Sequence, residues 1–371
     1  MTEFEVTERN RYELDYLLEN RGDETTTEDV ELRVDGTVVD SDTSITLDAG
    51  EETTGTLVTD AFGENDVGET FEIELVGENT RQRDILVVGG TLDSVVAYGG
   101  DDDNTYVHDV FNGSLAYILS ESGTNVRDVA LSDSYIVYGG EDNNTYVHDL
   151  SDGSLAQTLT ESGNSVWNVG LSDSHVAYGG FDDNTYVHDV SDGSLVHTLT
   201  ESGSDVRGVA LSDSHVVYGG SDDNTYLHNV SDGSLAQTLT ESGDRVRGVA
   251  LSDSHVAYGG DDNTTYVHDV SDGSLVQTLT EADRVRDVAL SDSYVAYGGD
   301  DNNTYVHDVS DGTLVYTLTE SSSFVSDVAL SDSHVAYGGF DDNTYVHDLS
   351  NGSLVHTLSQ SGDTVRGVAL L

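Results

Sequence analysis

The fold is decided by the stretch from Val126 to Gly163, which reads VRDVALSDSYIVYGGEDNNTYVHDLSDGSLAQTLTESG. Four short runs rich in apolar and β-branched residues alternate in it with turn residues, at 126–131, 135–138, 145–150 and 154–159. The runs have lengths typical of β-strands, and none shows helical periodicity. We therefore expect four strands in this stretch, joined by tight turns.

This stretch is one of seven similar units. Its Tyr-Gly-Gly triplet recurs at Tyr98, Tyr138, Tyr178, Tyr218, Tyr258, Tyr297 and Tyr337. The spacing is 40 residues throughout, except for 39 across a deletion near Glu281-Ala282. Four strands repeated with this period predict an all-β fold, a seven-bladed β-propeller.

The two ends of the repeat region complement each other. The last unit continues into residues 364–370, TVRGVAL, which copy the first strand of the other units, whereas residues 84–90 depart from that pattern. We expect 364–370 to complete blade 1 of a propeller domain that spans 89–371. Such closure removes the exposed strand edges of an open array.

The repeated unit resembles the WD-repeat pattern, in the order Val-Arg-Gly-Val-Ala-Leu-Ser, Asp-Asn-Thr-Tyr-Val-His-Asp-Val and Asp-Gly-Ser-Leu-Val-His-Thr-Leu. Where that family has Trp-Asp, this chain has His-Asp in six units and His228-Asn229 in the fourth. The family's Gly-His pair is replaced by Glu-Ser-Gly. The resemblance therefore implies the blade architecture but not the family's tryptophan–histidine hydrogen-bond network.

Residues 1–83 contain no repeat, and strand-like runs separated by turn signals indicate a small antiparallel sandwich over 1–88. The order Leu-Leu-Glu-Asn-Arg-Gly-Asp, Val-Glu-Leu-Arg-Val-Asp-Gly-Thr-Val-Val-Asp and Leu-Asp-Ala-Gly-Glu resembles CARDB-type immunoglobulin-like domains. The resemblance implies a spacer or adhesion module on a prokaryotic surface protein. Arg21-Gly22-Asp23 spells an adhesion tripeptide, but we interpret it as an ordinary turn.

The composition excludes several functions. The 371 residues include 71 acidic and 13 basic ones, all arginine, so the formal net charge is −58. Without cysteine and lysine there is no disulfide, no thiolate nucleophile, no lysine Schiff base and no P-loop lysine. Such a charge also disfavours binding to nucleic acid phosphates.

We interpret the acidity as that of a halophilic archaeon or its virus, because molar salt screens repulsion between surface carboxylates within about 3 Å. The sequence contains no run of about 18 apolar residues, which predicts no membrane insertion. Its first residues, Met1 to Glu5, lack the features of a secretory signal. We expect a location on a virion or cell exterior, with the cytoplasm as the alternative.

The repeats argue against a catalytic, metal or cofactor site, and none is predicted. Each third strand carries one histidine, and a metal centre needs several that converge. The recurring Ser-Asp-Ser-His, as at Ser172 to His175, is interpreted as a turn. Seven nearly interchangeable units offer similar surfaces rather than distinct catalytic roles.

Departures from the repeat are therefore the candidate partner-binding positions. Aromatic residues interrupt blades 3 and 7, and arginines gather on blades 4 to 6. Arginine and large aromatic side chains dominate interface energetics. The predicted contact residues are Trp167, Phe181, Arg207, Arg245, Arg247, Arg284, Arg286, Phe324 and Phe340. The competing interpretation is that the arginines only pair with neighbouring aspartates.

From these features we expect a non-enzymatic binding or attachment protein. Its propeller would be the recognition face, and its sandwich would connect it to a surface assembly such as a haloarchaeal virion spike. Expected partners are other proteins of that assembly, or a host surface glycoprotein or glycan. The alternatives are an intracellular interaction scaffold and, less favoured, a glycan-active enzyme.

Overall fold

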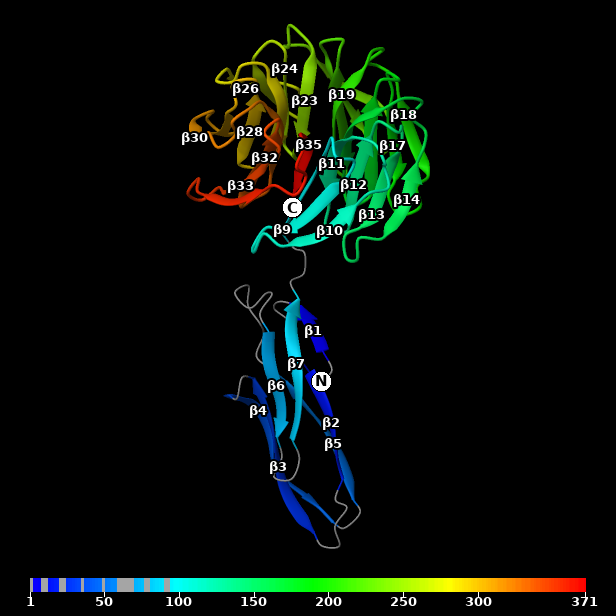
Figure 1. Cartoon of the computed structure of the whole chain (residues 1–371). Helices are drawn as coiled ribbons and strands as arrows, with labels where there is room; N and C mark the ends of the chain where they lie inside the picture. Colours follow the sequence, from blue (N-terminus) through cyan, green and yellow to red (C-terminus); the bar gives the residue numbers. More distant parts are fainter. Residues whose placement is uncertain are drawn as a thin grey trace. The chain divides into compact units, whose positions relative to one another are not determined.

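The chain divides into two compact units, Met1–Asp93 and Ser94–Leu371, each described by itself (Figure 1). The computed structural model describes residues 3–7, 13–19, 25–34, 37–48, 51–58, 70–76, 81–89 and 94–371. Regular structure in these ranges is entirely β-strand. The described residues form no helix that is long and apolar enough to cross a membrane.

The second unit consists of seven four-stranded antiparallel sheets, the blades. The first strands are β35 (Val365–Leu370), β11 (Val126–Leu131), β15 (Val166–Leu171), β19 (Val206–Leu211), β23 (Val246–Leu251), β27 (Val285–Leu290) and β31 (Val325–Leu330), for blades 1 to 7. The second strands are β8 (Val95–Gly100), β12 (Tyr135–Gly140), β16 (His175–Gly180), β20 (His215–Gly220), β24 (His255–Gly260), β28 (Tyr294–Gly299) and β32 (His334–Gly339).

The outer half of each blade follows the same order. The third strands are β9 (Thr105–Asp109), β13 (Thr145–Asp149), β17 (Thr185–Asp189), β21 (Thr225–Asn229), β25 (Thr265–Asp269), β29 (Thr304–Asp308) and β33 (Thr344–Asp348). The fourth strands are β10 (Leu115–Leu119), β14 (Leu155–Leu159), β18 (Leu195–Leu199), β22 (Leu235–Leu239), β26 (Leu275–Leu279), β30 (Leu314–Leu318) and β34 (Leu354–Leu358).

The blades form a closed ring. Each first strand contacts the first strands of both neighbouring blades, and β35 and β11 complete the circle. Strand β35 pairs with β8, with Val365 opposite Gly100, and so supplies the first strand of blade 1. The second unit is thus a seven-bladed β-propeller, which confirms the architecture predicted from the repeat (Figure 1).

The Tyr-Gly-Gly triplet places a large side chain in the core beside two positions that admit none. Tyr138 is fully buried. A Cβ on Gly140 would lie 2.6 Å from the Asn125 backbone oxygen, because the first strand approaches the second closely there. Glycine is therefore required at this position by the close packing of the two strands.

A buried hydrogen-bond network holds each blade together, as blade 4 illustrates. The Tyr218 hydroxyl donates to Glu201 Oε2 at 2.9 Å and lies 3.2 Å from His228 Nε2. The other ring nitrogen of His228, Nδ1, lies 3.0 Å from the carbonyl oxygen of Gly233, so it carries the proton. All seven third-strand histidines are buried, so they serve packing and local hydrogen bonding within the blades.

The first unit contains two sheets. Their order is β1-β7-β6-β3-β4 and β2-β5. The strands are β1 (Glu3–Thr7), β2 (Glu13–Glu19), β3 (Thr26–Val34), β4 (Thr37–Leu47), β5 (Glu52–Val58), β6 (Thr70–Val76) and β7 (Arg81–Gly89). Strand β1 was not predicted from the sequence, and it pairs in parallel with β7. Arg21-Gly22-Asp23 lies outside the described residues.

Candidate functional site

A β-bulge sets the position of one variable side chain in each blade. In blade 4, Val206 pairs with Gly220 and Gly208 with Gly219, which leaves Arg207 as the extra residue. The same register shift occurs in the other six blades. A bulge interrupts the regular pairing and can redirect a side chain. Here it lies where the first strand begins and the second ends.

We call the seven bulged residues the bulge ring. They are Arg366, Arg127, Trp167, Arg207, Arg247, Arg286 and Ser326 in blades 1 to 7. All seven line one cavity of about 120 Å³. The bulge ring thus brings together one residue from every blade around a single hollow. We call the face formed by the loops entering the first strands and leaving the second strands the ring face.

Six of the seven ring residues contact the residue that follows Gly-Gly in their blade, which lies 14 positions later in the chain except in blade 1. Four arginines form ion pairs with it: Arg127 with Glu141, Arg247 with Asp261, Arg286 with Asp300 and, through ring closure, Arg366 with Asp101. In blade 4 the partner is Ser221, whose Oγ accepts from Arg207 Nε at 2.9 Å. Arg207 also reaches Asp205, at 3.3 Å. All five ring arginines thus lie within ion-pairing distance of a nearby acid, as the competing interpretation expects.

Blade 3 replaces the ion pair with two aromatic rings. Trp167 and Phe181 pack edge-to-face with centroids 4.3 Å apart. The guanidinium of Arg207 lies 4.6 Å from the Trp167 ring centroid, and that of Arg127 lies 5.5 Å from it. Cations over an aromatic face are favourable at these distances. Blade 3 thus carries an apolar pair of rings between two cations.

Blade 7 carries a second aromatic pair. Phe324 and Phe340 pack with centroids 5.9 Å apart, and Phe324 remains 39% exposed. Arg286 lies over Phe324 at 4.9 Å, and Arg366 lies over Phe340 at 4.9 Å. The aromatic residues predicted as contacts therefore form two pairs, and each is flanked by arginines.

Arg245 and Arg284 lie outside the bulge ring. Their side chains are 47% and 45% exposed, and both approach the nearly buried carboxylate of Asp261, Arg245 at 3.5 Å and Arg284 at 3.2 Å. Burial raises the pKa of Asp261, but the hydrogen bond from Arg247 and the charges of the three arginines lower it below its usual value. The backbone of Arg284 is left-handed, with φ 40°, beside the one-residue deletion.

Sequence reasoning placed the arginine cluster on blades 4 to 6 and did not bring Arg127 and Arg366 into it. The structure places them in the same ring, because ring closure makes blades 1 and 2 neighbours of the cavity. The signal was available: the column of residues after the first valine of each unit contains all seven ring residues.

Three buried carboxylates next to the bulge ring were also missed. Asp128, Asp287 and Asp327 each follow a ring residue and accept a backbone N–H from the next blade's first strand. Asn168 makes the same bond to Val209 at 2.5 Å. These side chains tie neighbouring blades together around the cavity. The corresponding column reads Asp, Asn, Gly, Gly, Asp, Asp, Gly for blades 2 to 7 and then 1.

These carboxylates are coupled. Burial raises the pKa of Asp287 to about 6. Burial and the charges of Asp287 and Asp128 raise the pKa of Asp327 well above its usual range. Like charges held in one buried site cannot all ionise easily. Asp287 and Asp327 form a carboxylate pair that is built from two adjacent blades.

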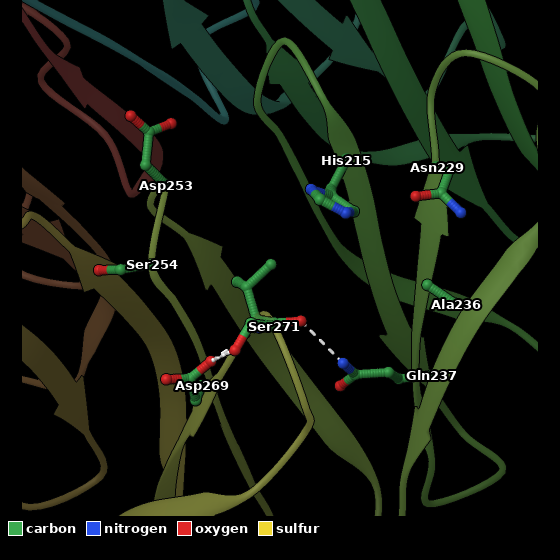
Figure 2. Close-up of a pocket in the computed structure, with 9 residues that line it drawn as sticks. His215, Asn229, Ala236, Gln237, Asp253, Ser254, Asp269 and Ser271 are labelled. Atoms are coloured by element: carbon green, nitrogen blue, oxygen red, sulfur yellow. Dashed lines mark hydrogen bonds between the residues drawn. The ribbon is translucent and has the colours of Figure 1, made fainter.

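A second hollow, a groove of about 590 Å³, lies between blades 4 and 5 on the opposite face (Figure 2). Its polar groups are largely satisfied within the blades: Gln237 Nε2 donates to the Val270 carbonyl at 2.7 Å, and Ser271 donates to Asp269. His215 lies opposite Asn229, where three other units place aspartate opposite histidine. Burial lowers the pKa of His215.

The Ser-Asp-Ser-His segments form a local contact rather than a relay. Ser214 Oγ lies 2.8 Å from His215 Nδ1, and the same contact recurs in three other blades. In each case the two residues are adjacent in the chain. Within the described parts of the chain, no group of three or more histidine and acidic side chains has the geometry of a metal site.

The chain matches no family model, and no curated protein matches it. The geometry of the bulge ring and its surroundings is therefore the basis on which its function is proposed.

Proposed function

We propose that the protein is a non-enzymatic binding protein that uses the ring face of its propeller for recognition. The observation that carries this proposal is the composition of the bulge ring. The whole chain has 71 acidic residues, and its propeller has only seven arginines. Five of these seven arginines line one cavity together with the only tryptophan of the chain. Tryptophan and arginine are the residues most enriched at binding hot spots.

The first unit supports an attachment role. Its resemblance to CARDB-type immunoglobulin-like modules favours a connector to a larger surface assembly, such as a haloarchaeal virion spike. The WD-like repeat and the acidic composition favour a protein–protein recognition module that operates in high salt. In this proposal the partners are proteins of that assembly or a host surface glycoprotein. The alternative is an intracellular scaffold in the cytoplasm, which would use the same face.

The test compares capture of partners by immobilised protein at molar salt. The wild-type chain is expected to retain a partner from envelope or particle extracts of a halophilic archaeon, and a Trp167→Ala/Phe181→Ala variant is expected to lose it. The matched control is Leu235→Ala, which trims an exposed apolar residue on the fourth strand of blade 4. Equal retention by the wild type and the double variant would contradict the proposal. Capture from cytosol alone would favour the scaffold.

The second candidate function, a glycan-active enzyme, is favoured by one observation. Asp287 and Asp327 both line the cavity at the bulge ring, and paired carboxylates serve as acid and base in glycoside hydrolysis. Its test is release of reducing ends from acidic polysaccharides by the wild type but not by Asp287→Asn. Activity unchanged in the variant, or absent from the wild type, would remove this candidate.

A further inference from the structure

Arginines of the ring face gather over blades 4 to 6. They are Arg207, Arg245, Arg247, Arg284 and Arg286. The carboxylates within ion-pairing distance of them are Asp205, Asp261 and Asp300, so five guanidinium groups share three carboxylates.

Arg207 departs from the pattern of the other ring arginines. In four other blades the ring arginine faces an aspartate or glutamate directly after Gly-Gly, and in blade 4 this place is taken by Ser221. Arg207 does reach Asp205, at 3.3 Å, through Nη2. It nevertheless lacks the loop carboxylate that Arg127, Arg247, Arg286 and Arg366 each have. The molecule thus contains four examples of a bonded pair and one position where the acid is missing.

The surroundings of Arg207 increase the free energy that an added anion would contribute. Its side chain is 13% exposed, and it lies over Trp167. Burial, followed by the nearby charge of Arg247, lowers the pKa of Arg207, with a further lowering contribution from Arg245. A buried cation beside other cations gains more from a new anion than an exposed one does. The charge-assisted bond would also be screened less by salt than a surface pair.

The cavity has room for a carboxylate group. Its volume is about 120 Å³, whereas about 10–15 Å³ on the same measure is enough for one water molecule. A planar carboxylate can also accept two N–H bonds from one guanidinium.

We propose that the cavity at the bulge ring binds the carboxylate of an aspartate or glutamate side chain from a partner protein, between Arg207 and Arg247 and beside Trp167. The inference rests on the proposed function and gives the chemistry of the partner. A protein carboxylate is favoured over other anions because aspartate and glutamate side chains fill the equivalent place in four other blades. The partner would thus complete the pattern that Ser221 interrupts.

The test uses the only tryptophan of the chain as its reporter. A capped tri-aspartate peptide is titrated into the full chain at constant molar NaCl, and Trp167 fluorescence and heat are recorded. We expect saturable binding by the wild type. The critical variant is Ser221→Asp, which supplies the missing acid internally and should lower peptide affinity at least tenfold. We expect this variant to fold, because blades 1, 5 and 6 have aspartate at the position equivalent to Ser221.

The matched control is Ser231→Asp. It adds the same charge at an exposed residue in the loop after the third strand of blade 4, on the opposite face, and should leave the affinity unchanged. Inorganic phosphate and glucuronate at equal charge are the competing probes. Tighter binding of either one than of the peptide would overturn the inference, as would a Ser221→Asp variant that binds the peptide as well as the wild type.

The two proposals fail in different ways. If Ser221→Asp still captures the natural partner while Trp167→Ala/Phe181→Ala does not, the ring face remains the recognition surface and the carboxylate inference is wrong. If both variants capture the partner as the wild type does, the proposed function itself is wrong.

Discussion

The buried tyrosine–histidine networks and the bulge ring each contribute one set of residues to every blade, but they differ in how strictly they repeat. All seven networks keep the tyrosine and the histidine, and six keep the glutamate, with Gln360 in blade 1 as the exception. The bulge ring instead contains arginine, tryptophan and serine. We infer that the tyrosine–histidine networks are needed for the structure of each blade. The bulge ring can contain different residues, because the backbone bulge sets their position.

Removing a tyrosine of one of these networks should cause the largest loss of stability. Tyr218→Ala leaves a cavity where a large side chain is fully buried. We expect the free energy of unfolding to fall by about 3–5 kcal/mol, as for other buried aromatic residues. Tyr218→Phe keeps the ring and loses only the hydroxyl, so it should cost about 1–2 kcal/mol. Denaturant unfolding at fixed salt measures both, and equal losses in the two variants would contradict a packing role.

Replacing a buried carboxylate beside the bulge ring should instead raise the free energy of unfolding. The pKa of Asp287 in the folded state is about 6, above its usual value near 3.8, so ionisation destabilises the fold and stability declines as pH rises from about 4 to 6. Asp287→Asn mimics Asn168, which occupies this position in blade 3. We expect the variant to be more stable by about 1–2 kcal/mol at pH 8.

The same variant should lose the part of the pH dependence that lies between about pH 4 and 6. Thermal unfolding across this range is the measurement, and Asp101→Asn, which changes a part-exposed carboxylate on the ring face, is the control. A slope that is the same in Asp287→Asn and wild type would contradict burial as the cause.

Gln360 of blade 1, which takes the place of the network glutamate, suggests a test of the charge in these networks. Burial would raise the pKa of Glu201, but the Tyr218 hydrogen bond and the charge of His228 lower it below its usual value. Its stabilising effect is therefore present above about pH 4.5 and is lost as pH falls through the lower folded value. Glu201→Gln, which copies blade 1, should cost about 1 kcal/mol at pH 7.

The reverse exchange, Gln360→Glu, should make blade 1 like the others and raise stability slightly at pH 7. The differences from the wild type should shrink as pH falls toward 3, because the carboxylate becomes protonated. Calorimetry at pH 7 and pH 3 measures both, and a Glu201→Gln loss that persists unchanged at pH 3 would count against the charged network.

The smallest effect is expected in the bulge ring itself. Arg366 pairs with Asp101 at 2.7 Å, and both side chains are part-exposed. Arg366→Gln should lower stability by no more than about 1 kcal/mol, because solvent screens such pairs. The same unfolding assay measures it. A loss as large as that of Tyr218→Ala would show that the ring, too, specifies the fold.

Much of the fold was predictable from the sequence because the same local signals are repeated seven times. Tyr-Gly-Gly and Ser-Asp-Gly each predict the end of a strand or a turn, and the apolar run predicts the first strand. The period of about 40 residues predicts that each repeat forms one blade. The resemblance to WD repeats did not reveal the Tyr218–His228–Glu201 network, since glutamate comes from the loop before the first strand. Only the folded blade brings that loop to the tyrosine hydroxyl.

The site was only partly predictable. Trp167, Arg207 and Arg247 stand out as departures from the repeat, but the sequence does not show that a bulge turns them toward one cavity. Arg127 and Arg366 looked isolated because blades 1 and 2 are far from blade 4 along the chain. The pair of Asp287 and Asp327 was missed because each residue comes from a different blade and resembles any other surface acid.

Ring closure also determines how the propeller resists a mechanical load. The segment that connects the two units enters the propeller at β8, which lies inside its sheet, between β9 and β35. Strand β8 can therefore leave the sheet only when its hydrogen bonds to both neighbouring strands break, whereas an edge strand is bonded to one neighbour. We expect a propeller loaded along β8 to resist more force than one loaded along an edge strand, and to fail in the blade that its two ends build together.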